Sequence, residues 1–305
     1  MAVMKATLHC GRLKGKSKAK HNDRSFDTSK NESIIHPEYS QYNVYYVSDE
    51  AGKFQPVQAG KGEFERRERE FYKEHFTASQ KAKNARYKAE GHKENCRSVT
   101  QLRKAQKTSP QEIILQVGKE ENPYLNAGKF QQMTQKFAMQ IRSEYKDFKI
   151  LNMAIHYDEL SAHAHIRGVF VARDKDGLET PNQTKALQAM GFGIPDPCKP
   201  KGQKNNELVT FTEQMRSEWQ DIIERTDPTI DIDREVKNPN QKHKSHKDKK
   251  AKELAELEKK LDAVKRNLIQ TDWGKLEAMT EFIEDKGMMQ EFEQFYENIF
   301  DLQYE

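Results

Sequence analysis

Five side chains that can bind a metal or carry a proton fall within ten residues of this 305-residue chain. They are His156, Asp158, Glu159, His163 and His165. Successive side chains of a strand point to opposite faces of a sheet, so His163 and His165 would share one face while Ala164 faces the core. His156 ends the preceding apolar run, where an antiparallel strand would bring it opposite the pair. Three imidazole nitrogens converging in this way suit zinc or a divalent transition metal, with positions left open for water or substrate.

Two simpler interpretations of this cluster stay open. The five residues would need no ligand if they were scattered polar groups on a solvated hairpin. A structural zinc site is the other alternative, but Cys10, Cys96 and Cys198 are isolated and no Cys-x-x-Cys pair accompanies the histidines.

A second segment with reactive chemistry lies near the N-terminus. The basic run 11–20 (GRLKGKSKAK) leads directly into His21, Asn22, Asp23 and Arg24. Such a loop can hold a phosphodiester against a reactive group, with the guanidinium of Arg24 positioning the phosphate. We therefore predict phosphate or DNA contacts for five residues of the N-terminal region, namely Lys18, Lys20, Asn22, Arg24 and Tyr45.

Both segments resemble motifs of one family. The run His156-x-Asp158-Glu159-x-x-x-His163-x-His165 resembles the metal motif of the MobV/Pre plasmid mobilisation relaxases, which belong to the HUH endonuclease class. Ala162 replaces the proline that usually precedes the His-x-His pair in that family. The N-terminal family motif, which carries the nucleophile, is matched by His21-Asn22-Asp23-Arg24, Asn31 and the segment 41–46 (QYNVYY). The resemblance covers roughly residues 1–250.

The resemblance implies an enzyme that nicks one DNA strand by transesterification. His21 would be the nucleophile and would form a covalent histidine–5′-phosphate adduct, which is later resealed. Glu159, supported by Asp158, would orient or deprotonate His21. His156, His163 and His165 would bind Mn²⁺ or Mg²⁺, and imidazole ligands favour manganese between these two. The DNA partner would be the origin of transfer of a supercoiled plasmid, in single-stranded or hairpin form, for mobilisation, conjugation or recombination.

Two other function classes remain open. A rolling-circle replication initiator would use the same metal with a tyrosine nucleophile, for which Tyr42, Tyr45 and Tyr46 are candidates. A non-enzymatic DNA-binding protein would use the metal structurally and would unfold when the metal is removed.

Charge is distributed unevenly along the chain. The net charge is +4, but residues 272–305 hold ten acids and two lysines, so the preceding residues hold 50 basic and 38 acidic groups. A basic body of this kind attracts polyanions such as nucleic acid. No apolar run is long enough for a membrane span or a signal peptide, and the few separate cysteines fit a reducing cytoplasm.

Hydrophobic periodicity predicts an α+β fold in which helices pack on one face of an antiparallel sheet. We expect strands near residues 3–8, 41–46, 111–117, 150–155 and 166–171, and helices near 63–90, 98–107, 127–148, 181–190 and 212–226. The expected division is a relaxase domain at 1–236, a basic linker at 237–250, and a helical, acidic segment at 251–305. In that segment Leu254, Leu257, Leu261, Val264 and Leu268 follow heptad spacing, which fits either a homodimer or packing back on the catalytic domain.

Overall fold

The structure, a computed structural model, describes residues 2–11, 19–27, 35–119, 122–159 and 161–233. The predicted linker 237–250, the helical segment 251–305 with its leucine heptads, and Lys18 of the basic loop all lie outside the described residues.

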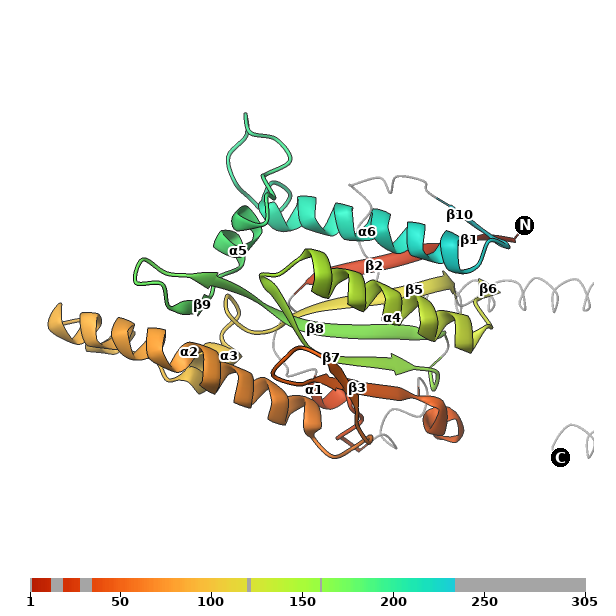
Figure 1. The fold of residues 1–305 in the computed structure, drawn as a ribbon, viewed down its shortest axis with the longest axis horizontal. Helices are drawn as coiled ribbons and strands as arrows, with labels where there is room; N and C mark the ends of the chain where they lie inside the picture. Colours follow the sequence, from red (N-terminus) through yellow and green to blue (C-terminus); the bar gives the residue numbers. More distant parts are fainter. Residues whose placement is uncertain (1, 12–18, 28–34, 120–121, 160, 234–305) are drawn as a thin grey trace, which may run out of the picture. The chain divides into compact units, whose positions relative to one another are not determined.

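An eight-stranded antiparallel sheet forms the centre of the fold (Figure 1). Its main path runs in the order β2 (Ala6–Gly11), β5 (Gln111–Lys119), β8 (His163–Arg173), β7 (Phe148–His156), β3 (Val44–Ser48) and β4 (Phe54–Pro56). Strand β6 (Asn122–Pro123) pairs with β5, and β9 (Glu179–Pro181) pairs with β8. A separate pair of parallel strands joins β1 (Ala2–Met4) to β10 (Ile230–Ile232).

Helices α4 (Ala127–Glu144), α5 (Gln183–Ala189) and α6 (Glu207–Thr226) cover one face of this sheet (Figure 1). The predicted apolar stripe of α4 is buried there, and Phe137 packs edge-to-face on Trp219 of α6 with ring centroids 5.6 Å apart. The helix ends at Glu144, four residues before the predicted end, and Phe148 instead begins β7 and packs in the same core. The predicted α+β class, an antiparallel sheet with helices packed on it, is confirmed.

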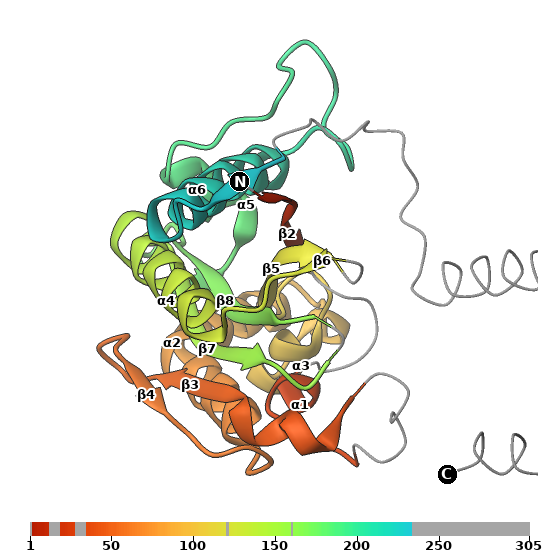
Figure 2. The same ribbon diagram turned by 90° about the vertical axis from the view of Figure 1, so that its right-hand side faces the viewer.

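A second set of helices packs on the opposite face, which the sequence had not led us to expect. It comprises α1 (Ala19–Asn22), α2 (Glu63–Ala89) and α3 (Val99–Lys104) (Figure 2). Phe71, Tyr72 and Phe76 of α2 pack on Leu151 of β7 and Val169 of β8. Both strands are apolar at successive positions, and a strand of that kind must be covered on both faces.

The helix α3 begins with a capping motif that can be identified in the sequence. Ser98 and Gln101 form a capping box, in which each side chain accepts a hydrogen bond from the other's backbone N–H. Two short 3₁₀ helices complete the described elements, η2 (Pro37–Tyr42) and η3 (Lys93–Asn95).

Asp227, directly after α6, connects the end of that helix to three neighbouring side chains. Its carboxylate accepts hydrogen bonds from the Thr229 hydroxyl at 2.7 Å and from the Tyr124 hydroxyl at 2.7 Å, and it pairs with Lys129 at 2.9 Å. These bonds, those from Thr229 above all, hold the pKa of Asp227 well below its usual range.

None of the described helices has the length and apolar character that a membrane crossing requires.

Candidate metal centre

The hairpin β7–β8 brings three predicted metal ligands onto one face of the sheet. His156 lies opposite His163 in the antiparallel register, and His165 lies opposite Ala154. The ring centroids are 5.3 Å apart for His156 and His163, 5.1 Å for His156 and His165, and 5.0 Å for His163 and His165. Ala164 points into the core on the other face, as predicted.

Each of the three imidazoles uses one ring nitrogen in a hydrogen bond to the protein. His156 Nε2 lies 2.8 Å from the carbonyl oxygen of Asn22, His163 Nδ1 lies 2.9 Å from that of Ser161, and His165 Nδ1 lies 3.2 Å from Glu112 Oε1. Carbonyl and carboxylate oxygens accept hydrogen bonds, so the ring nitrogens in these contacts are the protonated ones. The tautomer of each ring follows from its partner.

The second ring nitrogen of each histidine is then left with a free lone pair. His156 Nδ1 and His165 Nε2 are buried and have no hydrogen-bond partner, and His163 Nε2 lies 3.6 Å from Glu159 Oε2. Burial lowers the pKa of both His156 and His163, which keeps these rings neutral near pH 7. A buried, unpartnered lone pair on a ring whose other nitrogen is held by protein is the arrangement of metal-binding histidines, so these residues fit a metal ion.

In the described part of the chain, two overlapping groups of residues could each hold a metal ion, because the donor atoms within each group lie within 4.8 Å of one another. One group comprises His21, His156 and His165, and the other comprises His156, Glu159 and His163. Together they contain all three predicted ligands, and they add His21 and Glu159 as further donors at the same place.

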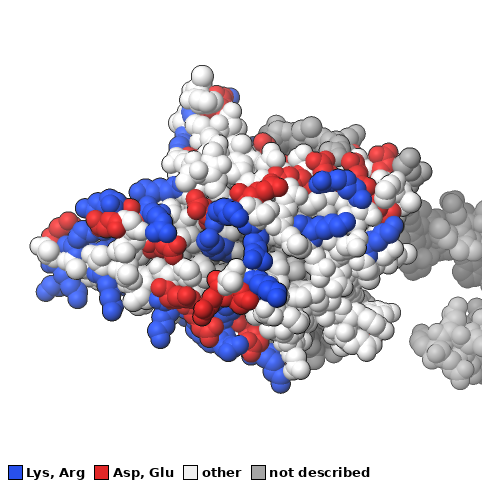
Figure 3. Space-filling model, viewed as in Figure 1, with Lys and Arg blue, Asp and Glu red and all other residues white. Residues whose placement is uncertain are grey.

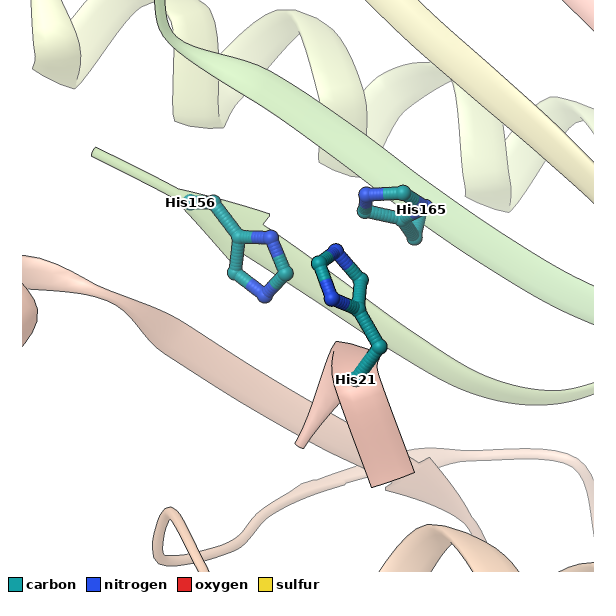
Figure 4. Close-up of side chains that lie close together, drawn as sticks. All are labelled: His21, His156 and His165. Atoms are coloured by element: carbon teal, nitrogen blue, oxygen red, sulfur yellow. The ribbon is translucent and has the colours of Figure 1, made fainter. Parts of the chain in front are cut away.

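His21 reaches this cluster from the opposite side, from the single turn of α1. Figure 4 shows its ring directed toward the space between His156 and His165, with centroid distances of 6.0 and 5.8 Å. The ring stacks on Phe26 with centroids 5.6 Å apart. Burial, together with the charge of Arg24, lowers the pKa of His21 to about 4, so its imidazole is neutral near pH 7. A neutral imidazole has the lone pair that a nucleophile needs.

Glu159 places its carboxylate beside the rings of His21 and His156. Its Oε1 lies 3.7 Å from His21 Nε2 and 3.9 Å from His156 Nδ1. Burial alone would raise the pKa of Glu159, but its neighbours His163 and Arg24 outweigh this effect and lower the pKa. Glu159 is therefore an ionised carboxylate close to the His21 ring.

Arg24 is buried in an ion pair and does not face solvent. Its Nη2 and Nε donate to the two carboxylate oxygens of Asp158 at 2.6 and 3.1 Å, and Nη2 also donates to Glu159 at 2.8 Å. Its Nη1 donates to the backbone carbonyl of His21 at 3.2 Å. The predicted phosphate contact does not fit this placement, because these acceptors already occupy the guanidinium. Arg24 instead ties the His21 backbone to Glu159 and Asp158.

The backbone of Arg24 supports the same interpretation. With φ of +56° it is the one residue other than glycine with a positive φ in the described part of the chain. It follows α1 in a position that usually takes glycine, and the backbone N–H of Ser25 closes the turn on the Lys20 carbonyl at 2.9 Å. A residue other than glycine in this backbone conformation destabilises the fold by roughly 1–3 kcal/mol, and the buried ion pair of Arg24 offsets this cost.

Asp158 was predicted to support Glu159 at His21, and the contacts of its side chain are with Arg24 and Ser40. Its side chain is fully buried and turned toward Arg24 and Ser40, whose hydroxyl donates to it at 2.9 Å. Burial would raise the pKa of Asp158, but its hydrogen bond and ion pair with Arg24 lower it. Arg24 in turn connects Asp158 to Glu159 and to the His21 backbone.

Glu112 of β5 is a site residue that the sequence analysis missed. Its Oε1 accepts hydrogen bonds from Asn22 Nδ2 at 2.6 Å and from His165 Nδ1 at 3.2 Å, and it lies 3.8 Å from Arg167 Nη1. Although burial opposes ionisation, these neighbours, His165 first among them, lower the pKa of Glu112 to about 2. Arg167 is held in turn by Glu68 of α2 at 2.7 Å. A glutamate directly before the apolar run 113–115 of this strand was the available signal.

Of the other described residues predicted to contact DNA, one is exposed and two are buried. Lys20 is exposed. Asn22 and Tyr45 are buried, Asn22 against Glu112 and Tyr45 against His156 with ring centroids 6.1 Å apart. A direct DNA contact by Asn22 or Tyr45 does not fit these positions, because neither side chain reaches the surface.

The three tyrosines that could serve as a nucleophile also differ in their exposure. Tyr45 is buried, and the Tyr46 hydroxyl accepts hydrogen bonds from Gln131 and Gln135 of α4, on the face opposite the histidines. Tyr42 is exposed.

Basic side chains gather on the second half of α2 and the segment after it. Between residues 73 and 107 nine Lys and Arg side chains are exposed, against three Glu. Figure 3 shows them over the end of the molecule to which α2 extends. This surface is suited to a polyanion.

No protein-family model and no curated protein matches the sequence. Among solved structures, the chain is similar to the MobM relaxase domain (MOBV; Mob_Pre) bound to oriT DNA of plasmid pMV158, in a Mn-bound crystal structure at pH 6.8. The identity is 17%, the TM-score is 0.45, and the match covers 82% of this chain and 98% of that one. A second Mn-bound structure of that domain with oriT DNA, at pH 5.5, matches with 16% identity and a TM-score of 0.45, over 82% of this chain and 99% of that one.

Proposed function

We propose that this chain is a metal-dependent DNA strand transferase of the relaxase type, which nicks one strand at a plasmid origin of transfer and later rejoins it. One observation carries the proposal. A neutral His21 imidazole lies beside His156 and His165, each of which has a buried, unpartnered ring nitrogen, and one donor atom from each of these three histidines lies within 4.8 Å of the others.

His156, His163 and His165 would hold a divalent ion, Mn²⁺ or Mg²⁺, with Glu159 and His21 adjacent to it. When bound, the ion polarises the phosphate oxygens and neutralises charge at the leaving oxygen. The imidazole donors favour manganese between the two ions. The solved MobM relaxase domains are Mn-bound and bound to oriT DNA, which agrees with both parts of the proposal.

His21 would perform the bond exchange. A ring nitrogen attacks the scissile phosphorus, a P–N bond forms, and the bond between phosphorus and the 3′ oxygen breaks. The 3′ oxygen takes a proton and leaves as a hydroxyl, while Glu159, 3.7 Å from His21 Nε2, accepts the imidazole proton. The product is a phosphoramidate that joins His21 to the DNA 5′ end. The reverse reaction reseals the strand.

The surrounding residues would position these groups. Arg24 fixes the His21 backbone relative to Glu159, and Asp158 fixes Arg24. Glu112 fixes His165 and Asn22. Phosphate contacts away from the bond exchange would come from Lys20 and from the basic surface of residues 73–107.

Incubation with a supercoiled plasmid that carries the chain's cognate origin region, with Mn²⁺ present, tests the proposal. Wild type is expected to give open circles with protein attached to the 5′ end, and His21→Ala is expected to give none. Tyr45→Phe, which keeps the buried ring beside His156, is the matched control and should nick as wild type does.

The other function classes give different outcomes in the same assay. If His21→Ala still forms the adduct and a tyrosine variant does not, a tyrosine is the nucleophile, as in a replication initiator. If no variant nicks but all bind DNA, and chelation of the metal unfolds the chain, the metal is structural.

A further inference from the structure

The 3₁₀ helix η2 presents two exposed aromatic rings. Tyr39 is 50% exposed and Tyr42 is 59% exposed, and they are the aromatic members of the small group of exposed large apolar side chains in the described residues. Aromatic rings of this size usually bury most of their surface, because leaving them in water forfeits a large hydrophobic contribution. The Tyr39 ring contacts His36 at 6.2 Å between ring centroids, and both tyrosines nevertheless leave at least half of their area exposed in the described structure.

Three hydrogen bonds fasten η2 to the histidine site. Ser40, which lies between the two tyrosines, donates its hydroxyl to Asp158 at 2.9 Å. The backbone N–H of His36 donates to the carbonyl of Asp158 at 2.7 Å, and the N–H of Tyr157 donates to the Asn43 side chain at 2.7 Å. The segment is therefore held at both ends beside residues 157–159. The segment that carries the two rings is bonded to the residues that directly precede Glu159.

The charge of η2 indicates what kind of ligand it fits. Its sequence, PEYSQY, contains Glu38 and no basic residue, so it repels phosphate groups. A tyrosine ring offers a flat face on which a nucleobase can stack, and such stacking tolerates any base sequence. In a duplex the faces of the bases are already stacked on each other. The surface is thus complementary to unpaired bases.

We infer that Tyr39 and Tyr42 form a stacking surface for unpaired bases of the DNA strand that enters the His21 site. This inference rests on the proposed function and extends it, because it specifies single-stranded DNA beside the scissile phosphate. Base stacking on η2 and phosphate contacts on basic side chains then act on the same strand through different chemistry.

Equilibrium binding of a labelled oligodeoxythymidine of about 12 nucleotides, within the usual range of single-strand sites, tests the inference. Chelator is present, so that binding is measured without nicking. Tyr39→Ala and Tyr42→Ala are each expected to weaken binding roughly 5- to 150-fold, the loss that one stacked base entails. Tyr39→Phe and Tyr42→Phe keep the ring and should bind within about twofold of wild type.

Two controls separate stacking from other effects. Met139 on α4 is 63% exposed on the opposite side of the sheet, so Met139→Ala removes exposed apolar area without changing the affinity. A blunt duplex of equal length should bind the alanine variants and wild type alike, because its bases present no free face except at the ends.

Binding of the oligodeoxythymidine and nicking of the origin together distinguish failure of this inference from failure of the proposed function. If wild type nicks its origin but both alanine variants bind the oligodeoxythymidine as wild type does, the stacking surface is refuted while the relaxase stands. If the phenylalanine variants lose as much affinity as the alanine variants, the hydroxyls and not the rings make the contact, and the inference is again wrong. If the alanine variants bind weakly and wild type does not nick, stacking is supported and the proposed function fails.

Discussion

Replacing Glu112 with glutamine tests how His165 is held for metal binding. Only Glu112 Oε1 accepts hydrogen bonds from Asn22 and His165, whereas Oε2 is buried without a partner. Glutamine can therefore keep the accepting oxygen in place and put its amide group at the Oε2 position. The substitution removes the negative charge while it preserves the shape and both hydrogen bonds.

The loss of that charge is expected to weaken Mn²⁺ binding. An ionised acceptor makes the His165 ring a more basic ligand, and changes to such partners typically cost about 10- to 100-fold in metal affinity. This corresponds to about 1.4–2.8 kcal/mol of binding free energy. The fold should persist, because Arg167 keeps its 2.7 Å bond to Glu68.

Isothermal titration calorimetry with Mn²⁺ measures the effect, and urea unfolding of the metal-free proteins verifies that the variant folds. Glu218→Gln is the matched control, since Glu218 is also buried and accepts a hydrogen bond from Gln214 at 2.9 Å, but it lies on α6. Our reasoning is refuted if Glu112→Gln binds Mn²⁺ as wild type does, or if Glu218→Gln weakens binding equally.

Three further predictions concern stability, and urea unfolding checks each of them. Asp158→Ala should cost about 3–5 kcal/mol, because it leaves the buried Arg24 guanidinium without its main partner. Gly168→Ala should cost about 1–3 kcal/mol, since a Cβ there would lie 2.8 Å from a backbone carbonyl oxygen of β7. Asp227→Asn should cost about 1.5–3 kcal/mol at pH 7. Hydrogen bonds led by those from Thr229 lower the pKa of Asp227, so this stability is present above its usual pKa and is lost as the pH falls below about 4.

Each of these predictions has a result that would contradict it. A cost below about 1 kcal/mol for Asp158→Ala would mean that Arg24 finds another acceptor or reaches water. Unchanged stability of Gly168→Ala would mean that β7 shifts without penalty. An Asp227→Asn deficit that stays constant from pH 7 to pH 3 would show that the carboxylate charge does not contribute.

The histidine hairpin could be predicted because its geometry is local. Alternation along a strand places His163 and His165 on one face whatever lies elsewhere in the chain, and the short turn after His156 brings the preceding strand alongside. The apolar stripe of α4 is local in the same sense. Its end was predicted too late, because Phe148 continues the helical spacing although it belongs to β7.

The partners of the site could not be predicted from local pattern, because they come from distant parts of the chain. Glu112 is 53 residues from His165, and the pairing of β5 with β8 brings them together. Arg24 is 134 residues from Asp158. A charged residue in a basic loop is expected to face solvent, and only the folded chain shows that this arginine is buried in an ion pair.

The sequence contained an indication of the second helical layer, which our prediction of a sheet covered on one face did not take into account. Strands β7 and β8 contain runs of successive apolar residues, at 153–155 and at 169–172, whereas a strand with one solvated face alternates polar and apolar residues. The Phe-rich face of α2 is the layer that such strands require.

Identification of the residue that bears the DNA is the most direct test of the proposed mechanism. The wild-type protein is trapped on its nicked origin, digested with protease and nuclease, and analysed by mass spectrometry. We predict a nucleotide on the peptide that contains His21, through a P–N bond that acid cleaves. A nucleotide on Tyr42 or another tyrosine, through an acid-stable bond, would contradict the assignment of His21 as the nucleophile.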